Sequence, residues 1–195
     1  NRKGETGGEK SGGTTGRTET GPGVLETSHI LIATGSVPAC PPIPGSSLPG
    51  VVTSDGLLDK KDMFEHLIII GGGVIGMEFA SVYSSLGHGV TVIEALDRIL
   101  PTMDKEIAQN LKMIMKKRNV DIHTGAKVEE ILQTEDGKGL ICRYTEKDKP
   151  CEARADGILI ATGRRAYTGG LITDESSREV KDMPWNAGVL SRMKI

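Results

Sequence analysis

Apolar and β-branched residues gather along this chain in short runs, most of which stop at glycine, and these runs predict a buried sheet. Strands that are covered on both faces show near-continuous apolar stretches rather than an alternating pattern. Five segments are predicted as strands, at residues 29–35, 67–70, 89–95, 120–125 and 157–163.

Helical periodicity fills two of the intervals between these strands. In the first helix, the predicted apolar face is spaced at i, i+4, i+7 and i+11 and consists of Ile75, Phe79, Val82 and Leu86. Gly87 and Gly89 end that helix. The second helix is predicted over residues 104–118, with Asp104 as its cap and with an apolar face of Ile107, Leu111 and Ile114.

The remaining segments predict connections and a second small sheet. Four prolines within residues 38–44 forbid both helix and central strand, so we expect an extended connector there. Residues 51–66 leave room for a short helical turn or two. Residues 127–155 alternate and carry Asp136-Gly137 at a turn, which predicts an antiparallel meander. The predicted fold class is α/β, a Rossmann-type parallel sheet flanked by helices with a small antiparallel β-meander.

Charge and composition exclude several classes of partner. The chain has a net charge of -2 and no basic run, so neither nucleic acid nor a membrane surface is an expected partner. Three cysteines, Cys40, Cys142 and Cys151, argue against a disulfide-stapled secreted fold and favour a cytoplasmic location. Free thiols are favoured over a bond between Cys142 and Cys151 on neighbouring predicted strands. The scattered histidines predict no metal site.

Residues 71–76 contain the motif Gly-x-Gly-x-x-Gly between a predicted strand and a predicted helix, which is the context of a dinucleotide site. Gly71 allows a tight turn out of the strand. Gly73 leaves space for a pyrophosphate beside the backbone, and Gly76 lets the helix pack close to the strand. The helix N-terminus then offers free N–H groups to the phosphates.

Two acidic residues near this motif refine the prediction. Glu94 ends the next strand, where a carboxylate accepts hydrogen bonds from the adenine ribose and repels a 2′-phosphate, so NAD(H) is favoured over NADP(H). Glu78 is predicted in the first turn of the helix, where an acid also stabilises the helix dipole.

Four motifs in this order resemble the pyridine nucleotide–disulfide oxidoreductases, and within them most resemble the dihydrolipoamide dehydrogenases. The motifs, within residues 28–172, are ATGSVPACPPIPG, GGGVIGMEFASVYSSLG, VTVIEALDRILPTMDKEI and ILIATGRR. The resemblance implies an NAD-binding domain inserted into an FAD domain, and electron transfer among NAD(H), FAD and a redox disulfide. The expected parts are a flexible Gly/Thr-rich tail (1–23), a connector with the FAD-domain junction (24–66), the NAD-binding domain (67–165), and a C-terminal tail (166–195) with a short helix over 176–183.

The resemblance also implies roles for single residues. The pyrophosphate of NAD is assigned to the segment that contains Gly71, Gly73, Val74, Ile75 and Gly76. Glu94 is assigned to the adenosine ribose and Val128 to adenine. Glu78 and Gly163 are expected on either side of the nicotinamide, and Thr34 and Gly35 near flavin at the domain junction.

Other parts of the family pattern do not occur in the sequence. It has one Gly-x-Gly-x-x-Gly and no cysteine pair separated by four residues, so no catalytic residue is assigned, and FAD and a dimer mate are expected only in the complete enzyme. Two alternatives stay open. One is a free-standing NAD-binding or redox-sensing module. The other is a related enzyme with another acceptor, such as an NADH oxidase, a coenzyme A disulfide reductase or a flavin-linked enoate reductase.

Overall fold

The computed structural model describes residues 30–167, 169 and 190–191. These belong to two units, one of residues 34–185 and a smaller one of residues 1–33 with 186–195. In the smaller unit, β1 (Ile30–Leu31) pairs antiparallel with β12 (Leu190–Ser191). The predicted N-terminal tail and the short helix over 176–183 lie outside the described residues.

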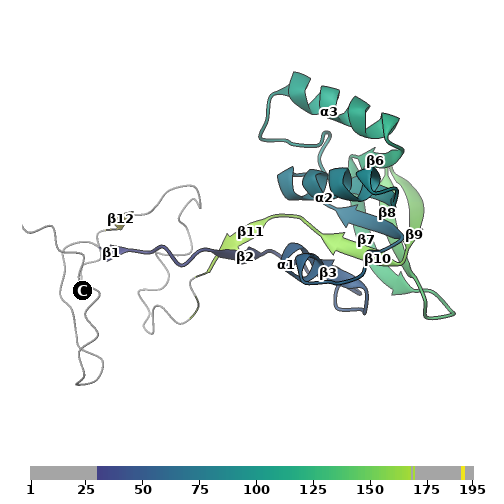
Figure 1. Ribbon diagram of the computed structural model, residues 1–195, viewed down its shortest axis with the longest axis horizontal. Coiled ribbons are helices and arrows are strands. Elements are labelled where there is room, and N and C mark those ends of the chain that lie inside the picture. Colours follow the sequence, from purple (N-terminus) through teal and green to yellow (C-terminus); the bar gives the residue numbers. More distant parts are fainter. Residues whose placement is uncertain (1–29, 168, 170–189, 192–195) are drawn as a thin grey trace, which may run out of the picture. The chain divides into compact units, whose positions relative to one another are not determined.

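The larger unit is built on five parallel strands in the order β3-β10-β4-β5-β6. Of these strands, β3, β10 and β6 are labelled in Figure 1. Strand β10 is the last of the five in the chain, yet it pairs with both β3 and β4. This parallel sheet confirms the predicted α/β fold. The strands are β3 (Val51–Thr53), β4 (His66–Ile70), β5 (Gly89–Glu94), β6 (Val120–Thr124) and β10 (Gly157–Ile160).

The sheet is covered on both faces, which is why its strands have continuous apolar runs. Along β4, Leu67 and Ile69 pack with residues of the two long helices, and Ile68 and Ile70 pack with residues of the antiparallel sheet. The helices are α2 (Val74–Ser85) and α3 (Lys105–Lys117). The antiparallel sheet confirms the predicted meander and consists of β7 (Ala126–Gln133), β8 (Leu140–Glu146) and β9 (Lys149–Ala155).

The predicted apolar face of α2 was wrong in part. Phe79 packs against the core as expected, but Val82 and Leu86 are 52% and 61% exposed, and the buried residues are Gly76, Met77, Ala80 and Tyr83. This helix is apolar around most of its circumference, so periodicity alone does not select the face. The small residues select it, because a Cβ on Gly76 would lie 2.0 Å from the Gly71 carbonyl oxygen.

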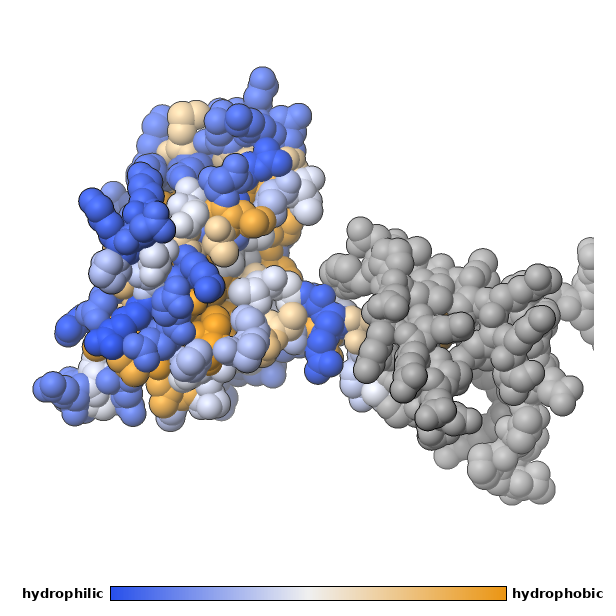
Figure 2. All heavy atoms as spheres, turned by 180° about the vertical axis from the view of Figure 1, so that it is seen from behind, coloured by the Kyte–Doolittle hydropathy of each residue, from blue (hydrophilic) through white to orange (hydrophobic). Residues whose placement is uncertain are grey.

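The predicted apolar face of α3 was also wrong in part. Leu111 packs against the core as expected, but Ile107 and Ile114 are exposed, and the buried residues are Ala108 and Met115. The predicted cap is confirmed, since the Asp104 carboxylate accepts a hydrogen bond from the Glu106 N–H at 2.9 Å. Figure 2 shows orange apolar surface between hydrophilic side chains on one face of the molecule. Exposed apolar side chains come from several elements, among them Leu58 of α1, Val82 of α2 and Ile107 of α3.

The segments before β4 differ from the sequence prediction in two ways. Of the strand expected over residues 29–35, the described residues form a strand only at Ile30 and Leu31, and residues 33–35 are exposed. Strand β3 was not predicted, whereas α1 (Ser54–Leu58) confirms the expected helical turn.

A short antiparallel ribbon was also not predicted. It pairs β2 (Ser36–Pro38) with β11 (Arg164–Ala166). The Arg164 guanidinium stabilises the ribbon through three hydrogen bonds. It donates to the Ser36 hydroxyl at 2.8 Å, to the Ser36 carbonyl at 2.7 Å and to the Asp55 carboxylate at 3.2 Å. The ribbon therefore holds the start of α1 as well as its own two strands.

The cysteines generate the first prediction. Cys142 is fully buried, and burial raises the pKa of its thiol to about 12, whereas Cys40 is exposed. The thiolate is the reactive form, so a thiol reagent at neutral pH should modify Cys40 in the native protein and leave Cys142 intact. Mass spectrometry of labelled peptides measures this. Equal labelling of Cys40 and Cys142 without denaturant would contradict the assigned burial.

Candidate functional site

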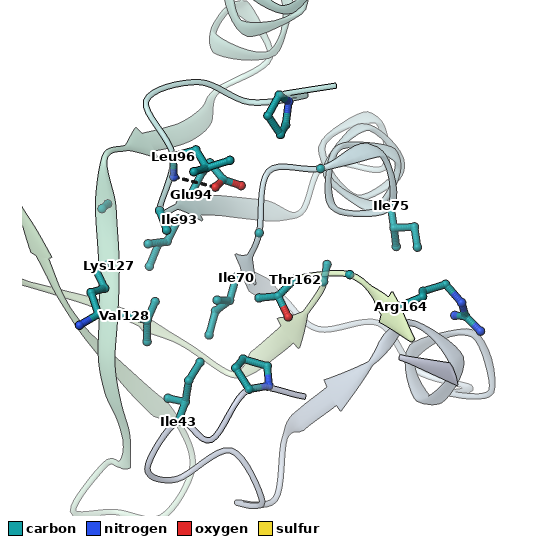
Figure 3. Close-up of a pocket in the computed structure, with 18 of the residues that line it drawn as sticks. Ile43, Ile70, Ile75, Ile93, Glu94, Leu96, Lys127, Val128, Thr162 and Arg164 are labelled. Atoms are coloured by element: carbon teal, nitrogen blue, oxygen red, sulfur yellow. Dashed lines mark hydrogen bonds between the residues drawn. The ribbon is translucent and has the colours of Figure 1, made fainter. Parts of the chain in front are cut away.

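An open cleft of about 860 Å³ lies where β4, β5 and β10 end. Its other sides come from the start of β7 and from the proline-rich segment at residues 41–44, as Figure 3 shows. Ligands of open α/β sheets bind outside the carboxyl ends of the strands, and ligand pockets have volumes of about 300–1,000 Å³. The location and the size of this cleft both suit a small-molecule ligand.

The three glycines of the motif have different surroundings. Gly71 has φ +111°, and a Cβ there would lie 2.5 Å from the Ala161 carbonyl oxygen, so it makes the tight turn that the sequence predicts. Gly76 allows the close approach of α2 to the strand. Gly73 caps α2, and a Cβ there would meet nothing within 4 Å. Only at Gly73 is the backbone open for a ligand beside the helix N-terminus.

Glu94 is 92% buried and holds the glycine loop in place. One carboxylate oxygen accepts a hydrogen bond from the Gly72 N–H at 2.6 Å, and the other accepts one from the Leu96 N–H at 2.8 Å. The Gly72 carbonyl in turn accepts from the Leu100 N–H at 2.8 Å. The peptide at Gly72 is therefore held on both sides, and the Glu94 oxygens keep further lone pairs for ligand hydroxyls.

The cleft brings together most of the residues predicted to bind the cofactor. Those that line it are Gly71, Gly73, Val74, Ile75, Glu94, Val128 and Gly163. Gly76 lies behind them, in the contact between α2 and the strand. Glu78 is exposed and does not line the cleft. It lies in the second turn of α2 rather than the predicted first turn, so the helix dipole does not account for it.

Thr34 and Gly35 also lie away from the cleft. The Thr34 hydroxyl donates to the Tyr167 carbonyl, and the Tyr167 N–H donates to the Gly35 carbonyl at 3.0 Å. These bonds continue the pairing of the β2–β11 ribbon. The two residues therefore have a structural contact of their own, independent of any ligand.

Sequence reasoning missed one wall of the cleft and two cationic residues that line it. The segment at residues 41–44 lines the cavity although the prolines predicted only a connector. Lys127 and Arg164 are lining residues, but Figure 3 shows their charged groups turned away from the cavity. In the part of the chain that the structure describes, no group of three or more His, Cys, Asp or Glu residues could hold a metal, and no helix could cross a membrane.

Comparisons with known proteins agree with this architecture. The sequence pattern of pyridine nucleotide-disulphide oxidoreductases matches residues 10–184. A dihydrolipoamide dehydrogenase of Chaetomium thermophilum is 42% identical over 146 residues, which are 73% of this chain and 29% of that protein. The probable pyridine nucleotide-disulfide oxidoreductase RclA of Escherichia coli is 38% identical over 159 residues, 81% of this chain and 35% of that one.

The solved structures that are similar in fold include the following two. The HOCl-induced flavoprotein disulfide reductase RclA of Escherichia coli has a TM-score of 0.62 at 39% identity and covers 72% of this chain and 31% of its own. The water-forming NADH oxidase of Lactobacillus brevis, bound to NADH, has a TM-score of 0.62 at 25% identity and covers 74% of this chain and 32% of its own. The chain spans about a third of the length of these relatives.

The buried carboxylate generates a prediction about stability. Glu94→Ala leaves the N–H groups of Gly72 and Leu96 without acceptors, so we expect the free energy of unfolding to fall by about 2–4 kcal/mol, measured by urea denaturation. Glu94→Gln keeps one acceptor oxygen and should lose less. Glu94→Arg removes both acceptors while it inverts the charge, so it should destabilise the loop as Glu94→Ala does. Wild-type stability in the alanine variant would contradict the role of Glu94 as the holder of the loop.

Proposed function

Because the chain belongs to the pyridine nucleotide-disulphide oxidoreductase family, we propose that residues 67–165 bind NAD(H) for a flavin-dependent oxidoreductase of the dihydrolipoamide dehydrogenase type. The observation that carries the proposal is the presence in one cleft of the open Gly73 backbone and the buried Glu94 carboxylate. The first suits a pyrophosphate at a helix N-terminus, and the second suits the hydroxyls of a ribose.

Each proposed contact follows from a local property of the chain. The free N–H groups at the start of α2 would bind the phosphates, and Glu94 would accept from the ribose hydroxyls while it repels a 2′-phosphate, which favours NAD(H) over NADP(H). Val128 would contact the adenine. Gly163 lines the cleft beyond the glycine loop and would be near the nicotinamide, and Glu78, which is exposed on α2, would lie on the other side of the nicotinamide. The bound nicotinamide supplies the hydride chemistry.

The complete enzyme is proposed to contain parts that these residues do not supply. We place residues 24–66 and the ends of the β2–β11 ribbon, with Thr34 and Gly35, at the junction with an FAD domain, and we expect a dimer mate.

Cys40, Cys142 and Cys151 are free thiols in the structure, which suits a reducing, cytoplasmic compartment. The NADH oxidase among the similar structures supports an alternative terminal acceptor, and a module without turnover is the third candidate.

Nucleotide binding by the purified chain tests the proposal. We expect NADH to bind more tightly than NADPH, and Gly73→Val to weaken NADH binding about tenfold or more, because the new side chain occupies the open space beside the helix N-terminus. Isothermal titration measures both. Gly56→Val is the matched control, since Gly56 also has room for a Cβ but lies in α1 and does not line the cleft. Equal affinity for NADH in both variants would contradict the phosphate assignment.

A visible absorption spectrum separates the candidate functions. The sequence has a single Gly-x-Gly-x-x-Gly, which is assigned to NAD, so we expect the purified chain to be colourless while it binds NADH. A flavin band that bleaches when NADH is added would instead mean that this chain holds flavin and turns over. If the chain is colourless, it can be mixed with the FAD-binding part of a relative and assayed with candidate electron acceptors, which would show which acceptor is reduced.

A further inference from the structure

The segment between β5 and α3 contains a leucine in a rare backbone conformation. Leu100 has φ +48°, in the left-handed region, which a residue with a Cβ adopts at a cost in free energy. It does not lie in an exposed turn, because its side chain is only 4% exposed and packs in the buried cluster shared with α2 and α3. Packing therefore holds Leu100 in a strained conformation, and such strain often has a functional reason.

The left-handed turn directs the Leu100 N–H at the glycine loop. This N–H donates to the Gly72 carbonyl at 2.8 Å. Ile99 closes the space beside that glycine, since a Cβ on Gly72 would lie 2.9 Å from the Ile99 Cγ2 atom. The Arg98 guanidinium donates to the Pro101 carbonyl at 2.9 Å and ties the two ends of the turn together. The segment thus fixes the direction of one carbonyl in the glycine loop.

The direction of that carbonyl also sets the direction of an N–H. The peptide between Gly72 and Gly73 is trans, and the C=O and N–H of a planar trans peptide point in opposite directions. The Gly72 carbonyl points at Leu100, so the Gly73 N–H points away from Leu100. Among the described residues this N–H has no acceptor. Gly73 lines the cleft, whereas Gly72 and Leu100 lie behind its wall.

We infer that Leu100 is a positioning residue for the dinucleotide phosphates, because its left-handed backbone holds the peptide between Gly72 and Gly73 with the N–H, rather than the carbonyl, on the ligand side. The inference rests on the proposed NAD(H) function, which assigns the pyrophosphate to the start of α2. If the peptide turned over, a carbonyl oxygen would face the phosphates and repel them. Leu100 does not line the cleft, so it acts on the ligand only through the loop.

Two truncations of Leu100 separate positioning from packing. Glycine adopts the left-handed region readily and alanine does not, so Leu100→Ala should release the Gly72 carbonyl and Leu100→Gly should keep it. We expect the NADH affinity of the full chain, measured by isothermal titration, to fall about tenfold in Leu100→Ala and about two- to threefold in Leu100→Gly. Packing alone predicts the opposite order, because the smaller residue leaves the larger cavity.

Leu57 supplies the matched control. It belongs to the same buried cluster and is 6% exposed, but it lies in α1 and does not line the cleft. We expect Leu57→Ala and Leu57→Gly to keep wild-type NADH affinity, with the glycine variant less stable in urea. Adenosine, which carries no phosphate, should bind equally to the wild type and to the Leu100 variants in an NMR titration.

A backbone replacement tests the N–H without truncation. The α-hydroxy analogue of leucine at residue 100 keeps the side chain and places an ester oxygen where the N–H was, so the Gly72 carbonyl loses its donor. We expect NADH affinity to fall about tenfold and adenosine binding to stay unchanged. The core stays filled in this form, so it remains a test where the truncated variants do not fold.

The outcomes separate the inference from the proposed function. If the wild type binds neither NADH nor adenosine, the NAD(H) proposal fails, and the role of Leu100 fails with it. If the wild type binds NADH but Leu100→Gly loses at least as much affinity as Leu100→Ala, Leu100 acts through packing and the inference alone is overturned. Wild-type NADH affinity in the ester form, or an equal loss for adenosine, would also overturn it.

Discussion

The hydrogen bonds between the Glu94 carboxylate and the glycine loop are the constraint around which the cleft is built. They fix the peptide at Gly72, and this sets where the backbone at Gly73 opens to the cavity. The same carboxylate is the group proposed to distinguish the two pyridine nucleotides. Loop geometry and nucleotide preference are therefore linked in one side chain, so a related protein that favours a 2′-phosphate needs another acceptor for the Gly72 N–H or a differently held loop.

The two covered faces of the sheet contribute separately to the cleft. The helix side supplies the N-terminus of α2, whose approach to the sheet depends on Gly76. The meander side supplies Val128 and, through the contact between Ile131 and Pro44, the connector wall. The sheet lies between these layers and holds them in register, because the residues of β4 alternate between the two cores. The cleft thus depends on packing in both layers at once.

Much of this arrangement was predictable from short-range patterns. The glycine spacing, the strand-end acid and the alternating meander each report a local requirement, and each element formed where the pattern placed it. The helix faces were not predictable in the same way, because α2 and α3 have apolar residues on more than one side and tertiary packing selects among them. The wall at residues 41–44 carries too weak a signal by itself. Its position depends on a hydrogen bond between Ile131 and Pro44, which are distant in sequence, and no local pattern encodes that contact.

The order of the strands in the sheet has a consequence for biosynthesis. Strand β10 joins β3 to β4, but about ninety residues lie between the end of β4 and the end of β10. At translation rates of about 5–20 residues per second, the nascent chain holds β4 with the backbone groups of one edge unpaired for roughly 5–20 seconds. An unpaired edge on a strand with apolar side chains is a template for association with other chains. The strand that leads into the glycine loop is thus open to misassembly during synthesis, and a chaperone that binds early would protect it.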